Sequence, residues 1–86
     1  MESVLAEVQV VFREAFGTDS QVISLETNPG DVPAWDSVGH LDLASRLEQV
    51  FNVSFDVDDL MEMENVREIV RIIDAKLKRR AVGNDG

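Results

Sequence analysis

Few side chains in this chain of 86 residues could do chemistry. It has no cysteine, which removes disulfides, thiolate metal sites and a cysteine nucleophile together. Its single histidine, His40, shares a helical register with Ala44, Leu47 and Phe51, which favours a half-buried structural histidine over a catalytic one. No remaining pattern pairs a nucleophile with a base. The sequence therefore predicts a protein that is not an enzyme.

A metal site is also not expected. The segment Asp56-Val57-Asp58-Asp59 has the acidic start of a calcium loop, but its sixth position is Met61 rather than glycine. Its twelfth position is Arg67 rather than glutamate, so the bidentate ligand of such loops is missing. We interpret the segment as the start of a short helix that is capped by Asp56.

Ser37 is the residue whose setting could carry a function. It follows Asp36, begins a predicted helix and stands at the end of a long loop. It could be an ordinary helix N-cap, which would make its role purely structural. It could also be an attachment point, because the free N–H groups at a helix start stabilise an anion such as a phosphodiester. The local sequence leaves both interpretations open.

The regular spacing of apolar residues predicts the helices that would position Ser37. Apolar residues recur at three- and four-residue intervals over 4–16, 37–51 and 66–77, and Gly17 and Asn52 end the first two helices. A brief helix is expected from Asp56 to Met61, and Asn65 with Glu68 reads as a capping box for the last helix. Residues 18–36 show no sustained period and form a long loop. We expect Val22, Ile23, Leu25, Val32 and Trp35 to anchor that loop on the core.

The predicted fold class is therefore all-α, a small four-helix bundle with a long first loop and a short third helix. One domain spans residues 1–80, and residues 81–86 form a flexible C-terminal tail. Met61 and Met63 are expected to pack in the core rather than to form a special surface. The inward residues of the long helices should be Phe12, Phe16, Leu47, Val50, Phe51, Ile69 and Ile73.

Charge is distributed unevenly along the chain. Residues 1–75 hold 16 acids against four arginines, whereas residues 76–86 hold four bases against Asp85. A body this negative repels nucleic acids and anionic membrane surfaces, so partners should be proteins with basic patches. No apolar run approaches the ~18 residues of a membrane span, and a cytoplasmic monomer is the expectation.

One stretch of the chain resembles a known family. Trp35-Asp36-Ser37-Val38-Gly39-His40-Leu41-Asp42-Leu43, followed by Leu47-Glu48 and Phe51, is similar to the modification site and second helix of acyl carrier proteins. The likeness extends over nearly the whole chain, in its helix lengths, long loop and acidic second helix. It implies that Ser37 carries a 4′-phosphopantetheine arm, with Asp36 in a supporting role. The arm's thiol would hold acyl groups as thioesters, which suits a chain without cysteine.

The resemblance also implies partners, namely a phosphopantetheinyl transferase and the enzymes that load and process acyl groups. The second helix should present a docking face that combines a small apolar contact with acidic steering charges. The residues expected on that face are Val38, Leu41, Asp42, Ser45, Glu48 and Gln49.

This chain departs from the fatty-acid type of the family, which usually has leucine and then an acid after the serine. Val38 and Gly39 stand there, and Ser45 stands where an apolar residue is usual. We therefore expect a freestanding carrier of a dedicated polyketide, aminoacyl or specialised fatty-acyl pathway. The alternative is an acidic helical interaction module without a prosthetic group, in which Ser37 is only a cap.

Overall fold

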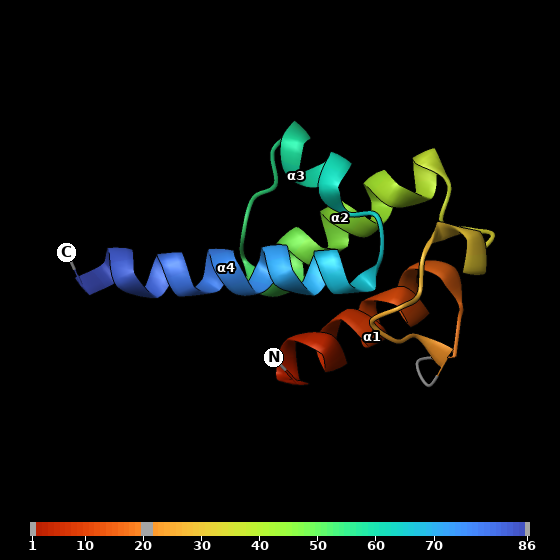
Figure 1. Cartoon of the computed structure of the whole chain (residues 1–86), viewed down its shortest axis with the longest axis horizontal. Helices are drawn as coiled ribbons and strands as arrows, with labels where there is room; N and C mark the ends of the chain where they lie inside the picture. Colours follow the sequence, from red (N-terminus) through yellow and green to blue (C-terminus); the bar gives the residue numbers. More distant parts are fainter. Residues whose placement is uncertain (1, 20–21, 86) are drawn as a thin grey trace.

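The computed structural model describes residues 2–19 and 22–85, and their side chains over 4–19 and 22–79. It contains four α-helices, α1 (Glu2–Phe16), α2 (Ser37–Phe51), α3 (Val57–Glu62) and α4 (Val66–Asp85), and one 3₁₀ turn, η2 (Pro29–Asp31). No strand occurs among these residues. The all-α fold class predicted from the period is confirmed. In Figure 1, α4 extends at its C-terminal end well past the other helices.

Helices α1 and α2 end where their sequences predict. Gly17 has a φ of 71° and Asn52 a φ of 55°, the left-handed conformation that closes α1 and α2. Asp56 accepts a hydrogen bond from the Asp59 N–H and donates its own N–H to the Asp59 carboxylate, which makes a capping box at the start of α3. Asn65 accepts from the Glu68 N–H at the start of α4.

The core lies between α1, α2 and α4, with α3 packed mainly on α4. Phe12, Leu47, Ile69 and Ile73 are fully buried at its centre, as predicted, while Phe16 and Phe51 pack against it from partly buried positions. Burial of these apolar side chains is the main driving force for the fold.

Three apolar residues expected in the core lie outside it. Val22 is 66% exposed, Val50 is 46% exposed and Met61 is 72% exposed, whereas Met63 is buried. Val50 stands seven residues after Leu43 on the same side of α2, yet it is exposed in the last turn of the helix whereas Leu43 is fully buried. Met61 and Met63 lie two residues apart, so one faces outward when the other faces the core.

The long loop is fastened to α4 by backbone hydrogen bonds. The first N–H groups of a helix have no partner within it, and here the N–H groups of Val66 and Arg67 donate to the Thr27 and Leu25 carbonyls. Gln9 of α1 donates to the Ile23 carbonyl. Ile23, Val32 and Trp35 are buried, so three of the five expected anchors are in the core and Leu25 packs beside it. The loop that leads to Ser37 is therefore held in place on α1, α4 and the core.

The last helix is longer than the sequence suggested. The domain was expected to end at residue 80, with a flexible tail over 81–86, but α4 continues through Asp85. Lysine and arginine are good helix formers, and four of them stand in the stretch 76–80. The side chains of 80–86 lie outside the described part of the chain, as does Gly86 altogether. The flexibility of this segment stays a prediction.

Candidate functional site

Asp36, and not Ser37, caps helix α2. The Asp36 Oδ1 accepts a hydrogen bond of 2.8 Å from the Gly39 N–H, and Asp36 has the extended backbone typical of an N-cap. Ser37 is the first residue inside the helix and is exposed. The purely structural interpretation of Ser37 as the cap is therefore wrong. Its hydroxyl is left available at the helix start.

Gly39 explains one departure of this sequence from the acidic residue usual in the fatty-acid type. A Cβ at this position would lie 2.1 Å from the Ala34 carbonyl oxygen and 3.1 Å from a ring carbon of Phe16. The loop thus presses its backbone directly onto the first turn of α2, and only glycine leaves room for it. The residues that flank Ser37 are held by this close approach.

His40 has the structural role that its register predicted. The Trp35 indole Nε1 donates to His40 Nδ1 over 2.8 Å, and His40 Nε2 lies 2.9 Å from the Leu60 carbonyl oxygen. An indole N–H can only donate and a carbonyl can only accept, so this geometry requires the neutral tautomer with its proton on Nε2. The ring is therefore bonded on both sides and half-buried.

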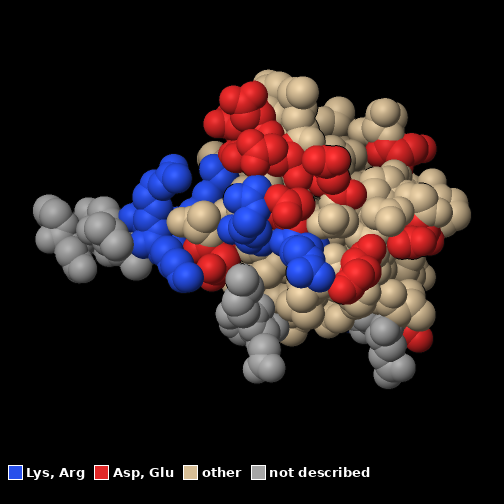
Figure 2. All heavy atoms as spheres, in the orientation of Figure 1, with Lys and Arg blue, Asp and Glu red and all other residues tan. Residues whose placement is uncertain are grey.

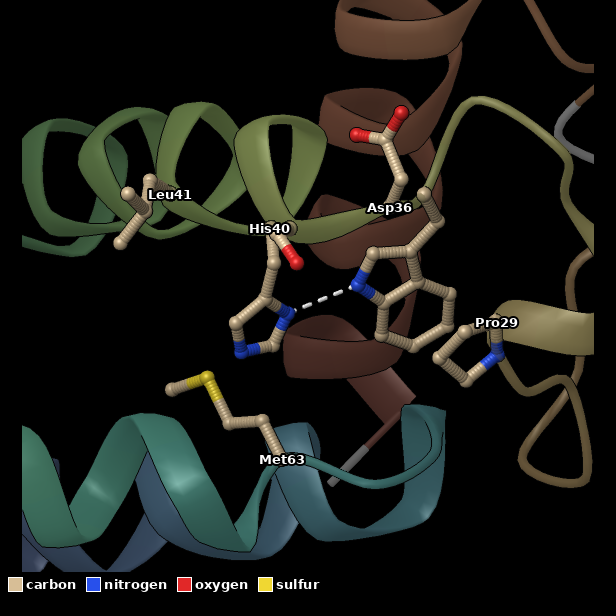
Figure 3. Close-up of a pocket in the computed structure, with 7 residues that line it drawn as sticks. Pro29, Asp36, His40, Leu41 and Met63 are labelled. Atoms are coloured by element: carbon tan, nitrogen blue, oxygen red, sulfur yellow. Dashed lines mark hydrogen bonds between the residues drawn. The ribbon is translucent and has the colours of Figure 1, made fainter.

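A cavity of about 520 Å³ opens beside Ser37. Figure 3 shows Pro29 from the loop, Asp36 and Leu41 from the α2 region, and Met63 from the end of α3 around it. Its full lining is Pro29, Trp35, Asp36, Ser37, His40, Leu41 and Met63. These walls are mostly apolar, and Asp36, Ser37 and His40 contribute the polar side chains. Such a hollow has room for a flexible chain attached at Ser37.

The first turn of α2 suits a phosphodiester at Ser37. The N–H of Gly39 binds Asp36 Oδ1 and the N–H of His40 binds the Asp36 carbonyl. The N–H groups of Ser37 and Val38 precede them in the turn, at the positive end of the helix dipole. A phosphate group on the Ser37 hydroxyl would lie close to this end. The residues present therefore fit a 4′-phosphopantetheine arm.

The residues predicted for docking do not all point outward. Val38 is 77% exposed and Leu41 is 60% exposed, and Ser45 and Gln49 are also exposed. Asp42 is on the same surface, where its carboxylate pairs with Arg46 at 3.0 Å.

Glu48 lies differently from the other docking candidates. Its carboxylate accepts a hydrogen bond of 2.8 Å from the Phe55 N–H, in the connector between α2 and α3. Glu48 is thus half-buried and fixes the backbone there. Because its carboxylate is engaged by the Phe55 N–H within the molecule, the outward face of α2 is less acidic than the sequence suggested.

Sequence reasoning missed an apolar pair on α3. Val57 and Met61 are 69% and 72% exposed and stand four residues apart on one face of the helix, next to Asp58. The sequence contained a signal for this exposed pair, because the two apolar residues are spaced i, i+4 in an acidic helix. So short a helix buries only one of its faces.

The cations of α4 are mostly paired with acids. Figure 2 shows Lys and Arg side chains gathered along α4, with Asp and Glu over much of the rest of this face. Lys76 pairs with Asp59 at 2.8 Å, and Arg71 with Glu62 at 3.0 Å. Burial acts to raise the pKa of Asp59, but the hydrogen bonds from Lys76 and the Asp56 backbone, with the Lys76 charge, together hold that pKa below its ordinary value.

Other kinds of site find no support in the described residues. Among them, no three histidine or acidic side chains gather closely enough to hold a metal ion. The carboxylates of Asp56 and Asp59 are committed to capping α3. Within the same residues, no helix is both long and apolar enough to cross a membrane.

Comparison with known proteins agrees with this geometry. A family model described as a phosphopantetheine attachment site matches residues 6–73. Acyl carrier proteins from Coprothermobacter proteolyticus and Phytoplasma australiense are 26% and 31% identical over 88% and 86% of this chain, and over 93% and 97% of their own lengths.

The structural comparison points the same way. A solution structure of the holo acyl carrier protein from Geobacter metallireducens superposes with a TM-score of 0.82 at 33% identity, covering 91% of this chain and 90% of that one. The family match favours a carrier with a prosthetic group over an interaction module without one. This chain belongs to the acyl carrier protein family, whose members carry acyl groups on a covalent 4′-phosphopantetheine and are not themselves enzymes.

Proposed function

We propose that Ser37 is the attachment residue of the arm. The observation that carries this proposal is that Asp36 caps α2 and leaves the Ser37 hydroxyl exposed at the start of the helix. A serine that capped its own helix would have its oxygen engaged by a backbone N–H. The cavity beside Ser37 supports the same assignment.

The arm supplies the thiol that this cysteine-free chain lacks, and with it the ability to hold an acyl group as a thioester. The residues of the chain have simpler tasks. Asp36 keeps the turn closed, and the first N–H groups of α2 stabilise the phosphodiester charge. Leu41, Met63 and Pro29 provide apolar walls beside the attachment point.

The outward face of α2 is our candidate for docking. Val38 and Leu41 offer an apolar contact of modest size, and Asp42, Ser45 and Gln49 surround it with polar groups. Such a face suits a phosphopantetheinyl transferase and acyl-processing enzymes that carry basic patches, because charge speeds the encounter and a small apolar contact allows quick release. Glu48 contributes by holding the connector after α2 in place rather than by direct contact.

We further propose that the carrier serves a dedicated polyketide, aminoacyl or specialised fatty-acyl pathway. The support is that the recognition face departs from the fatty-acid type. Gly39 makes close backbone packing rather than offering an acid, Ser45 is polar, and Asp42 is paired with Arg46. Enzymes that recognise a strongly acidic second helix would find fewer free charges here.

The attachment is tested by intact mass. The protein is incubated with coenzyme A and a broad-specificity phosphopantetheinyl transferase, and its mass should increase by one phosphopantetheinyl group. Ser37→Ala should show no increase, while Ser54→Ala, which changes an exposed serine outside the candidate docking face, should be modified like wild type. Modification of Ser37→Ala would overturn the site assignment. Unmodified wild-type protein would overturn the carrier function itself.

A further inference from the structure

The position of Ser37 depends on its neighbours. Its side chain is exposed, and no described residue makes a hydrogen bond to its hydroxyl. In the transfer, the Ser37 oxygen bonds to the pyrophosphate phosphorus that bears the pantetheine group, the bond from that phosphorus to the bridging oxygen breaks, adenosine 3′,5′-bisphosphate leaves, and the hydroxyl proton passes to the transferase. The hydroxyl must therefore meet that phosphorus at short range and in the right direction. Groups that fix the backbone on either side of Ser37 therefore matter to that reaction, even without touching the reactants.

Trp35 fixes the backbone on the loop side. Its ring is only 3% exposed and meets the Phe12 ring of α1 edge-on, with centroids 5.0 Å apart. Its ring is nearly parallel to that of His40, with an interplanar angle of 16° and centroids 6.1 Å apart, and the two rings lie edge to edge. The hydrogen bond of 2.8 Å from its Nε1 to His40 Nδ1 satisfies an indole N–H that would be costly to bury unpaired. The loop is thus anchored two residues before Ser37.

His40 extends this anchor to α3. The Leu60 carbonyl oxygen, in the last turn of α3, accepts a hydrogen bond from the N–H of the cap residue Met63 over 3.4 Å, and a carbonyl oxygen can accept a second hydrogen bond. His40 Nε2 lies 2.9 Å from the Leu60 carbonyl oxygen, so one rigid ring joins the loop on one side and α3 on the other. Figure 3 shows the bond between the two rings within the cavity wall. We call Trp35, His40 and the Leu60 carbonyl the clasp.

We infer that Trp35 and His40 are positioning residues for Ser37, which set where its hydroxyl is presented to the phosphopantetheinyl transferase. This inference rests on the proposed attachment at Ser37. The clasp holds the turn that carries the hydroxyl, whereas Leu41 and Asp42, our candidates for docking, point outward. Loss of the clasp should therefore lower the transferase kcat for this protein and leave KM nearly unchanged.

The test is a double-mutant cycle with Trp35→Phe and His40→Phe. Both keep an aromatic ring in place, and each removes the bond between the two rings. The probe is a broad-specificity phosphopantetheinyl transferase with fluorescently labelled coenzyme A, and rates are corrected for the folded fraction. We expect each single variant to lower kcat on the order of tenfold with KM within about twofold. The double variant should be no slower than His40→Phe, because the same bond is already lost.

Two further variants separate the halves of the clasp. Asparagine places an amide oxygen near the position of Nδ1, so His40→Asn can still accept from Trp35. Glutamine reaches the position of Nε2, so His40→Gln can still donate to Leu60. We expect His40→Asn to recover most of the wild-type kcat and His40→Gln to remain slow, because the Trp35 bond is the one next to Ser37.

The control is Ile73→Val, a core change in α4 away from the clasp that should lower Tm without changing kcat. Wild-type kcat in His40→Phe, a change confined to KM, or additive losses in the double variant would each overturn the inference. These outcomes are distinct from failure of the proposed function, in which wild-type protein takes no arm or Ser37→Ala still takes one.

Discussion

Replacing Gly39 with alanine tests the packing that delivers Ser37. The new Cβ would lie 2.1 Å from the Ala34 carbonyl oxygen, whereas real Cβ contacts stay above 3.0 Å. The atom that must move is a backbone oxygen, so the loop itself has to shift away from α2. Such a shift would strain the Asp36 cap, whose carboxylate binds the N–H of this same residue.

Two opposing effects determine how much Gly39→Ala changes the free energy of unfolding. Alanine is favoured over glycine in a helix by at most about 1 kcal/mol, and less in the first turn. Forcing an extra carbon into a close contact typically costs about 1–3 kcal/mol. We therefore expect Gly39→Ala to be less stable by about 1–2 kcal/mol, which in a domain of this size lowers Tm by about 5–15 °C.

The assay is thermal unfolding followed by circular dichroism, with transferase kinetics on the same samples. Ser45→Ala is the matched control, because it also places alanine in α2 but at an exposed position where nothing is crowded. Its Tm should equal or slightly exceed that of wild type. A Gly39→Ala protein with an unchanged or higher Tm would show that the loop does not press on α2 as the structure has it.

Substitutions at four other residues have expected outcomes. Leu47→Ala, at a fully buried position, should cost about 2–5 kcal/mol by denaturant titration, and a nearly unchanged midpoint would contradict the assigned core. Asp36→Asn should keep Tm, because asparagine caps as well as aspartate, whereas Asp36→Ala should lose about 1 kcal/mol. Leu41→Ala should hasten dissociation from the transferase while changing stability by less than about 0.5 kcal/mol; wild-type rates would remove it from the docking face. Asp59→Asn should lower Tm at neutral pH, because the folded state lowers the pKa of Asp59 and its stabilisation is present above the unfolded pKa. That difference should fade as pH falls below about 4, and a constant gap would refute the role of the charge.

The sequence predicted the helices because their information is local. The apolar period and the residues Gly17, Asn52 and Asp56 act within one or two turns, so boundaries could be placed without knowledge of the fold. Identification of Ser37 as the candidate attachment residue had the same basis, together with the family resemblance. The cap was assigned less well, because aspartate and serine have nearly equal preferences for the N-cap position and the two stand side by side.

The structural features that the sequence did not predict depend on contacts between residues far apart in the chain. The bonds from Val66 and Arg67 to the loop carbonyls join segments about forty residues apart, and no local pattern encodes them. Glu48 looked like an outward acid by register, but its side chain reaches the Phe55 N–H seven residues later. Met61 was assigned to the core because it stands beside Leu60 in an amphipathic segment, although α3 is too short and too peripheral to bury both of its faces.

The contacts around Ser37 bear on how a carrier can serve several enzymes. On the proposed attachment at Ser37, the partner must find the same hydroxyl in the same place at each visit, yet Ser37 itself must stay free of contacts that would block the arm. The chain meets both demands by fixing the neighbours of Ser37: Asp36 binds the Gly39 N–H, Ala34 packs on Gly39, and Trp35 binds His40. A reactive group held only through its neighbours remains exposed without becoming mobile. Variation in recognition can then be confined to the outward face of α2, which makes none of these contacts.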